Sequence, residues 1–261
     1  MIDMSKEKNI RNSIDLLLDV CSLMMTSGAN TKRIIDSVNR FAQVLNLKSH
    51  ALISHKSIIM TLIDLETNES YTVVTQIPRH GVNYSIVSDV SRASWVAVNH
   101  QWSFEKLYNR IQEIKSQKRY PVWLELITVS LAGAGFARIF GGDYLNMLVA
   151  FIATFIGFSV SKTAHHYKAN TYVRVYLASM AASLVASLGI LYGIGQHPDI
   201  ALATAILFLV PGVQLINSFN DLYNNHILNG IVRFVSGFII VLAISLGMLT
   251  IMLIFKLNVL G

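Results

Sequence analysis

Polar residues follow an interruption in one of the hydrophobic segments near the C-terminal end of the chain. Pro211 removes a backbone hydrogen-bond donor and Gly212 loosens the helix further, so the carbonyl groups freed at this break need polar partners. Asn217 and Asp221 are four residues apart and share one helical face. A carboxylate among amides at a membrane boundary suits recognition of a polar, zwitterionic solute, although such residues could instead cap and close the helix end. The predicted substrate path consists of these four residues and of a second pair with the same spacing, Asn220 and Asn224.

Three further charges lie within or beside the hydrophobic segments: Glu125, Arg138 and Arg174. Ionisable residues at membrane depth are costly and usually face protein or water, so these side chains are candidates for functional charges inside the membrane. The alternative is that each lies near a membrane surface and extends its charge into water.

A second candidate site lies in the N-terminal half, where Ser27, Arg33, Arg79 and Asn83 stand at turns and helix starts. They could bind a small molecule, and the alternative is helix capping with surface charge. No metal site is predicted, because the adjacent pair His165-His166 rarely supplies a full ligand set. The sequence has no nucleophile turn, phosphate-binding loop or zinc-protease motif, so we expect no catalytic residue, no cofactor and no enzyme.

The composition indicates where these residues lie. The chain has 261 residues, of which 53% are hydrophobic and only 14% charged, against about 25% charged in a typical soluble domain. Residues 1–120 carry 26 charged side chains and residues 121–261 carry 10. We therefore expect a soluble domain over 1–120 and a transmembrane domain over 121–261, and no nucleic-acid partner, because the N-terminal charges are of mixed sign. The one cysteine, Cys21, excludes an internal disulfide and is expected to be buried.

Hydrophobic periodicity predicts the elements of the N-terminal half. Two amphipathic helices meet at the turn 26–30, and after it Asn30 or Thr31 can cap the second helix. Short segments rich in Ile, Val, Thr and Tyr then predict three strands, over 49–54, 57–64 and 70–77. The helical period returns over 87–98 and again over 104–114. The order helix-helix-strand-strand-strand-helix-helix predicts a small cytoplasmic α+β domain.

Five hydrophobic segments follow and predict an α-helical bundle of five transmembrane segments, each long enough to cross a bilayer. With a cytoplasmic N-terminus, seven Lys and Arg residues including Arg233 fall on the inner side and two, Arg138 and Lys256, on the outer side. We therefore expect a multi-pass protein of the cytoplasmic (inner) membrane with its C-terminus outside. The expected spans are 122–140, 144–160, 172–195, 200–216 and 231–255.

Small residues recur every four positions in the third segment, as in Ala178, Ala182 and Ala186. Such stripes let helices approach closely, either inside one chain or between copies. Five spans make a small bundle for a transporter, so we expect it to enclose a path by joining copies of itself or a second protein.

These motifs together resemble the threonine/serine exporter family in its split, two-component form. The resemblance covers residues 10–255 and is carried most specifically by the Val-Pro-Gly turn at 210–212 with Asn217 and Asp221 downstream. It is also carried by the segment 27–31 followed by Arg33, by Arg79-x-Gly81-x-Asn83, and by Gly141-Gly142. The chain departs from the family at Ser218-Phe219-Asn220, where Gly and Arg are common, so an anion contact is not carried over to those positions.

The resemblance implies an exporter of small hydrophilic metabolites, either amino acids such as threonine and serine or dicarboxylates such as succinate. Long members carry about ten spans in one chain, so five spans imply a separate small integral-membrane partner subunit. The alternatives are a non-transporting regulatory or scaffold subunit and, less favoured, a membrane-anchored enzyme.

Overall fold

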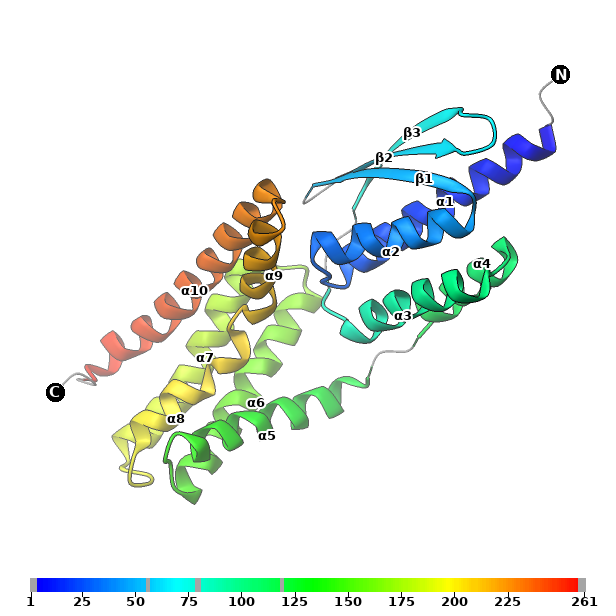
Figure 1. The fold of residues 1–261 in the computed structure, drawn as a ribbon. Coiled ribbons are helices and arrows are strands. Elements are labelled where there is room, and N and C mark those ends of the chain that lie inside the picture. Colours follow the sequence, from blue (N-terminus) through cyan, green and yellow to red (C-terminus); the bar gives the residue numbers. More distant parts are fainter. Residues whose placement is uncertain (1–3, 55–56, 78–80, 118–119, 258–261) are drawn as a thin grey trace. The chain divides into compact units, whose positions relative to one another are not determined.

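The computed structural model describes residues 4–54, 57–77, 81–117 and 120–257, and Figure 1 shows their fold. The chain divides into two compact units. Unit 1 consists of residues 1–118 and 213–234, and unit 2 of residues 119–212 and 235–261. The segment 213–234 therefore belongs with the N-terminal part of the chain, although it follows most of the hydrophobic segments.

The N-terminal part of unit 1 has two helices, three strands and two helices, in the order expected from hydrophobic periodicity. The strands form one antiparallel sheet in the order β1-β2-β3. The elements are α1 (Met4–Thr26), α2 (Thr31–Val44), β1 (Leu47–Ile53), β2 (Ser57–Asp64), β3 (Ser70–Gln76), α3 (Tyr84–His100) and α4 (Phe104–Lys115).

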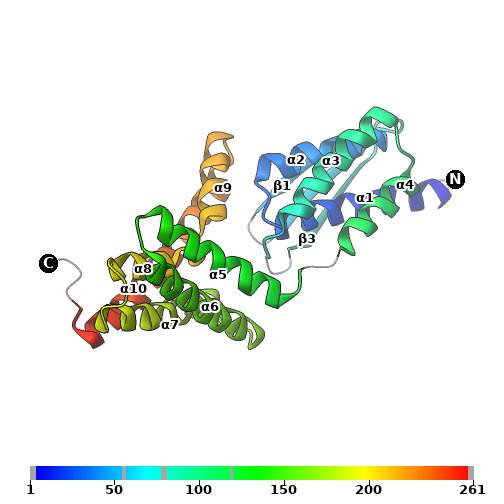
Figure 2. The ribbon, with the colours of Figure 1, turned by 90° about the horizontal axis from the view of Figure 1, so that it is seen from below.

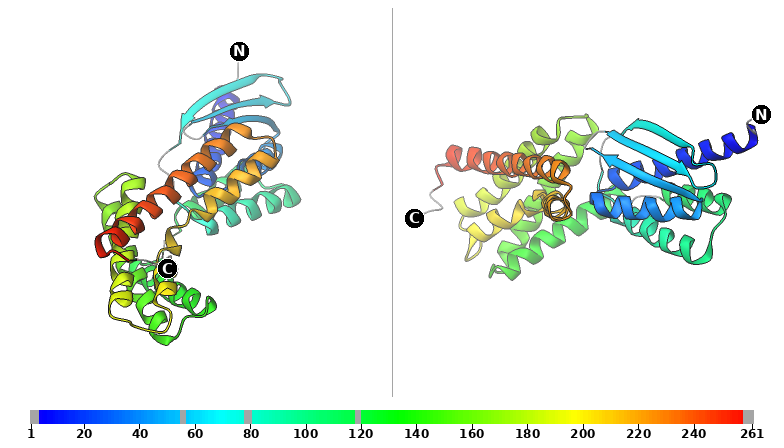
Figure 3. Two further views of the ribbon diagram at one scale, coloured as in Figure 1. Left: turned by 90° about the vertical axis from the view of Figure 1, so that its left-hand side faces the viewer. Right: turned by 45° about the horizontal axis from the view of Figure 1, so that its top comes forward.

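The sheet, the pair α1 and α2, and the pair α3 and α4 form three layers within unit 1 (Figures 1 and 3). Because side chains alternate along a strand, β2 directs Ile58, Met60 and Leu62 into the core. Leu17 of α1 and Ile111 of α4 are buried in the same cluster. The middle layer of helices is therefore covered on both sides, which fixes the turn between α1 and α2 from which the site is built.

Cys21 lies in this core and is buried, as the sequence predicts. Burial in apolar surroundings raises the pKa of its thiol to about 12, because the thiolate would lose its hydration. The side chain acts as a small apolar residue of the core.

Unit 2 consists of packed helices (Figure 2). Its close contacts involve small residues: a Cβ added at Gly157 would lie 2.7 Å from Ala182 Cβ, and one at Gly247 would lie 2.7 Å from the carbonyl oxygen of Tyr176. The alanines 178, 182 and 186 are fully buried, so this stripe packs inside the chain. The helices are α5 (Val122–Ile139), α6 (Tyr144–His166), α7 (Thr171–Leu191), α8 (Pro198–Ala205), a 3-10 turn (Leu207–Leu209) and the part of α10 (Ile227–Phe255) from residue 235 onward.

Four helices of the described chain are long and apolar enough to cross a membrane: α5, α6, α7 and α10. A fifth span is obtained only if the bent pair Pro198–Leu209 and Gly212–Tyr223 is counted as one. The segment expected to span 200–216 is thus not one continuous helix, because Val210 adopts an extended conformation (φ −56°, ψ 125°) before Pro211. α9 (Gly212–Tyr223) starts anew after the break.

The ends of two other spans also differ from expectation. α7 ends at Leu191 rather than near residue 195, because Gly193 and Gly195 adopt positive φ values of 59° and 86°. α10 begins at Ile227, four residues before the expected start. Its first two turns are the part that packs in unit 1.

The Gly141-Gly142 motif forms the connection between α5 and α6. Gly141 has a φ of +95°, and a Cβ at Gly142 would lie 2.8 Å from the carbonyl oxygen of Ala137. Asp143 then caps α6 by accepting a hydrogen bond from the backbone N–H of Asn146 at 2.8 Å. That hydrogen bond, helped by one from the Gln196 N–H, lowers the pKa of Asp143. The motif is therefore explained by a tight turn and a helix cap.

Candidate functional site: a buried polar cluster in unit 1

The turn between α1 and α2 presents backbone donors at the start of α2. Gly28 adopts a φ of +93°, and its N–H and that of Ala29 donate to the carbonyls of Met25 and Met24, which ends α1. Asn30 then caps α2, because its Oδ1 accepts a hydrogen bond from the Arg33 N–H at 2.8 Å. The next residue of the helix, Thr31, still has an N–H group without a partner inside α2.

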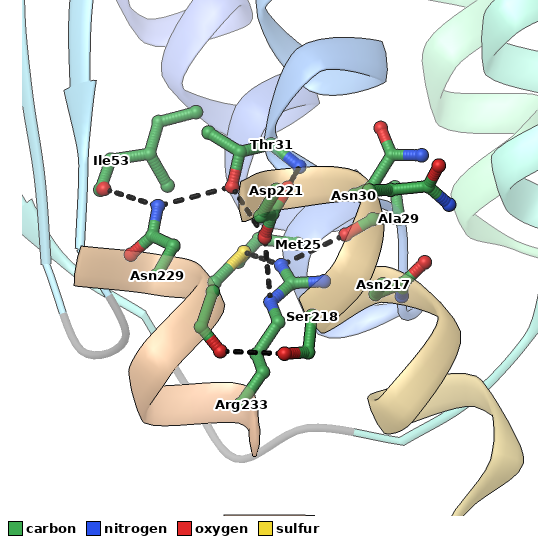
Figure 4. Close-up of polar contacts among 12 residues, drawn as sticks. Met25, Ala29, Asn30, Thr31, Ile53, Asn217, Ser218, Asp221, Asn229 and Arg233 are labelled. Carbon is green, nitrogen blue, oxygen red and sulfur yellow. Dashed lines mark hydrogen bonds and ion pairs between the residues drawn. The ribbon is translucent and has the colours of Figure 1, made fainter. Parts of the chain in front are cut away.

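Asp221 of α9 supplies that partner. Its Oδ1 accepts a hydrogen bond from the Thr31 N–H at 2.8 Å, and its Oδ2 accepts one from the Thr31 hydroxyl at 3.1 Å (Figure 4). The residue is fully buried. A carboxylate is favoured there because the N-terminal end of a helix carries partial positive charge. Asp221 thus acts as a cap for a helix 190 residues earlier in the chain.

Arg233 of α10 balances the charge of this carboxylate. Its Nε lies 3.2 Å from Asp221 Oδ2, and its side chain is only 10% exposed. Its Nη2 donates to the carbonyl oxygen of Ala29 at 3.0 Å and to Met25 Sδ at 3.4 Å. The guanidinium therefore connects the carboxylate to the last turn of α1, and the two buried charges sum to zero.

Three more side chains complete the arrangement. Asn217 donates from Nδ2 to the Gly28 carbonyl at 2.7 Å. Asn229 donates from Nδ2 to the Thr31 hydroxyl at 3.0 Å and to the Ile53 carbonyl at 2.8 Å. The Ser218 hydroxyl donates to the Gly230 carbonyl at 2.8 Å and so joins α9 to α10 (Figure 4). We call Thr31, Asn217, Ser218, Asp221, Asn229 and Arg233 the Asp221 cluster.

The turn between α9 and α10 holds the two charged residues at this distance. Asn225 adopts a φ of 62°, and the His226 N–H donates to the Asp221 carbonyl at 2.8 Å. Gly230 lies so close to α9 that an added Cβ would be 2.6 Å from Leu222 Cγ. A side chain at position 230 would therefore push α9 and α10 apart.

The structure brings two of the predicted groups together. Asn217 and Asp221 share a face of α9, as their spacing predicts, and that face meets the turn that contains Ser27. The Ser27 carbonyl accepts a hydrogen bond from the Asn83 N–H at 3.0 Å, and Asn83 caps α3. Arg79 lies outside the described residues.

The other predicted residues are not part of the Asp221 cluster. Gly212 is the first residue of α9, and Pro211 directly precedes it. Asn220 and Asn224 line a surface pocket together with Arg33. The three charges in unit 2 do not contact one another: Glu125 pairs with Lys162, Arg138 donates to the Gly142 carbonyl at 3.1 Å, and Arg174 contacts His165 Nδ1 at 3.0 Å. Within the part of the chain that the structure describes, no group of three or more metal-binding side chains occurs.

Sequence reasoning missed the two α10 residues of the cluster. The sequence pattern places Arg233 at the inner membrane edge and gives no signal for Asn229. A signal for Arg233 exists, since it is the only Asp, Glu, Lys or Arg residue in the helix Ile227–Phe255. A lone charge in an apolar helix of that length needs a partner.

Comparisons with known proteins agree on one family. Residues 15–255 match the family model described as "Putative threonine/serine exporter". The chain is 25% identical over 247 residues to the "Probable succinate transporter subunit YjjP" of Klebsiella aerogenes, covering 94% of this chain and 95% of that one. The protein of the same name from Escherichia coli K12 is 25% identical over 87% of this chain and 89% of its own.

A longer relative is named as an exporter rather than as a transporter subunit. The "Probable threonine/serine exporter" of Mycobacterium tuberculosis is 20% identical over 92% of this chain but only 45% of its own length. The chain thus corresponds to somewhat less than half of that protein. No solved structure matches the chain.

Proposed function

Because the chain belongs to the threonine/serine exporter family, we propose that it is one subunit of a two-component exporter of small hydrophilic metabolites in the cytoplasmic membrane. The subunit role is supported by two relatives that are named as transporter subunits and that align with this chain over nearly their whole length. A small integral-membrane partner would complete the transporter, and copies of the chain would assemble with it. The solute would be an amino acid such as threonine or serine, or a dicarboxylate such as succinate.

The Asp221 cluster is the observation that carries the mechanism. α9 follows the Pro211–Gly212 break, and its polar face is occupied by the turn between α1 and α2. A solute can reach Asn217 or Asp221 only after Thr31 and Gly28 release them. The cluster therefore acts as the inner closure of the path, and the N-terminal elements open or close it from the cytoplasm.

The partners of Asp221 also suggest how binding of a solute could open the closure. In the closed state the carboxylate of Asp221 binds a helix N-terminus and a guanidinium, which resemble the donors and the ammonium group of a polar solute. A solute that replaces these partners stabilises the open state by its own contacts. The N-terminus and unit 1 would face the cytoplasm, and the C-terminus would lie outside.

The test is efflux from cells loaded with labelled serine, threonine and succinate, which express this chain alone, the partner alone, or both. We expect efflux of one solute class only with both proteins present. Asp221→Asn and Asn217→Ala should reduce it at least about tenfold, because each removes a group that contacts the solute in the open state. Asp15→Asn, which changes an exposed carboxylate of α1, serves as the matched control.

Protein levels in the membrane must be equal for this comparison. Full efflux by Asp221→Asn at normal abundance would contradict the closure mechanism. Efflux by the partner alone, unchanged when this chain is added, would favour a regulatory or scaffold role instead.

A further inference from the structure

A pocket of about 350 Å³ opens on the surface of unit 1. It is lined by Arg33 and Arg40 of α2, by Trp95 of α3, and by Asn220 and Tyr223 of α9, among others. Its volume falls within the range of small-molecule sites, about 300–1,000 Å³. The pocket is separate from the Asp221 cluster but is built on the same two helices, α2 and α9.

The lining carries positive charge that is not neutralised. Lys32 Nζ and Asp36 Oδ2 lie 3.1 Å apart, so the carboxylate in the lining already has a partner. The Arg40 guanidinium has only neutral partners: it donates to the Ser94 hydroxyl at 3.2 Å and lies 3.8 Å from the centre of the Trp95 ring. Among the described residues, the guanidinium of Arg33 makes no hydrogen bond or ion pair.

Two guanidinium groups without an anionic partner favour a ligand that carries two negative charges. A guanidinium binds a carboxylate through two parallel hydrogen bonds. Arg33 and Arg40 are seven residues apart on one face of α2, roughly 10 Å along the helix axis, so each can hold one end of a short ligand with two anionic groups. A zwitterionic amino acid would bring its ammonium group toward these cations, with no free carboxylate in the lining to receive it.

We propose that this pocket binds a small dicarboxylate. The side chains of Arg33 and Arg40 hold its two carboxylates, and Asn220 and Tyr223 provide polar groups from α9 on the facing wall. Trp95 covers the apolar carbons of the ligand and keeps Arg40 in position.

The bound ligand has a mechanical consequence for the closure. Arg33 lies two residues after Thr31, and Asn220 directly precedes Asp221, so a ligand that contacts both walls stabilises the pairing of α2 with α9. Dicarboxylate concentration in the cytoplasm is therefore sensed at the closure. This consequence rests on the proposed exporter function, whereas the binding itself does not.

The test is equilibrium dialysis of labelled succinate against the purified full-length chain in detergent at constant ionic strength. Unlabelled succinate should displace the label, while butyrate, which has one carboxylate on the same carbon chain, and threonine should not. Arg33→Gln and Arg40→Gln should each weaken binding by about tenfold or more, because a charge-assisted hydrogen bond is lost. Arg92→Gln, an exposed arginine of α3 that does not line the pocket, should bind as the parent does.

Unchanged thermal unfolding of the ligand-free variants would show that they fold. The proposal is overturned if butyrate competes as well as succinate, or if folded Arg33→Gln and Arg40→Gln bind normally. Displacement by inorganic phosphate at the same concentration as succinate would also overturn it, and would assign the pocket to phosphate-bearing ligands. If succinate binds but the cells show no efflux, the binding site stands and the exporter proposal falls. If the cells show efflux but succinate does not bind, the exporter proposal stands and the binding site falls.

Discussion

Each unit contains an ion pair that joins two helices, and the two pairs have very different surroundings. In unit 1 the Asp221 side chain is 0% exposed and the Arg233 side chain 10%, whereas in unit 2 the values are 31% for Glu125 and 35% for Lys162. Asp221 also accepts two hydrogen bonds from Thr31. Among the described residues, the carboxylate of Glu125 has Lys162 as its only partner.

The difference shows that the surroundings of an ion pair decide what its loss costs. Removal of one partner from a buried pair leaves the other charge without compensation in a medium of low dielectric constant. Removal of one partner from a half-exposed pair lets water or lipid headgroups replace it. The pair in unit 1 therefore fixes the arrangement of three helices, and the pair in unit 2 adjusts the contact of two.

The largest effect is expected for Asp221→Ala. It should lower the free energy of unfolding of unit 1 by about 3–5 kcal/mol, because Arg233 and the Thr31 N–H both lose their partner. Urea unfolding in detergent, followed by tryptophan fluorescence, measures the change. The double variant Asp221→Ala/Arg233→Met should recover part of the loss, and equal stability of Asp221→Ala and the parent would contradict the assignment.

A smaller loss is expected when the turn that positions both charges is changed. Gly230→Ala should cost about 1–3 kcal/mol, because its Cβ would overlap with Leu222. Gly135→Ala is the matched control, since nothing lies within 4 Å of a Cβ built there. The losses from Gly230→Ala and Asp221→Ala should not add in the double variant, since both act on one contact. If the two losses in stability add fully, the turn does not position the charges of the Asp221 cluster.

Glu125→Gln should have a weaker effect than either change in unit 1. We expect a loss of about 1 kcal/mol or less, because the pair is partly exposed. The same unfolding experiment measures it, and Lys162→Met should give a similar value. A loss as large as that of Asp221→Ala would show that burial is not what distinguishes the two pairs.

The smallest effect is expected in the reactivity of Cys21, which is native to unit 1 and reports on its unfolding. Its raised pKa keeps the thiol neutral, so alkylation by iodoacetamide at pH 8 should be slow until unit 1 unfolds. Because burial favours the neutral form, its contribution to stability is complete below the unfolded pKa of 9.0 and is lost as the pH rises toward about 12. Faster alkylation in Asp221→Ala than in Glu125→Gln would show that Asp221→Ala destabilises unit 1. Equal rates in both variants would contradict a loss of stability confined to unit 1.

The elements of the fold could be predicted because local periodicity determines them. The three strands lie within a few residues of their expected positions, and the helix break at Pro211 follows from the missing N–H. The structure adds the size of this break: the helical segments on its two sides, Pro198–Leu209 and Gly212–Tyr223, are bent by 57° relative to each other, and the residue before the proline leaves the helical conformation. A hydrophobic segment of the right length therefore does not establish an unbroken helix.

Only the α9 residues of the candidate site could be predicted from the sequence. The four-residue spacing places Asn217 and Asp221 on one face, but no local pattern indicates that Thr31, 190 residues away, donates to Asp221. Arg233 fits the positive-inside rule equally well, so its charge alone did not reveal a buried partner. The partners come from tertiary packing, and that information is not present in spacing along the chain.

Unit 1 is built from two segments that are far apart in the chain, and this affects the order in which it can assemble during biosynthesis. Residues 1–118 leave the ribosome before residues 213–234, and at about 5–20 residues per second the interval is roughly 5–20 s. During that time the first turn of α2 has no carboxylate to cap it, while the helices α5 to α7 enter the membrane. Closure of the Asp221 cluster is therefore one of the last steps of assembly, and it takes place only in chains whose C-terminal helices have been made.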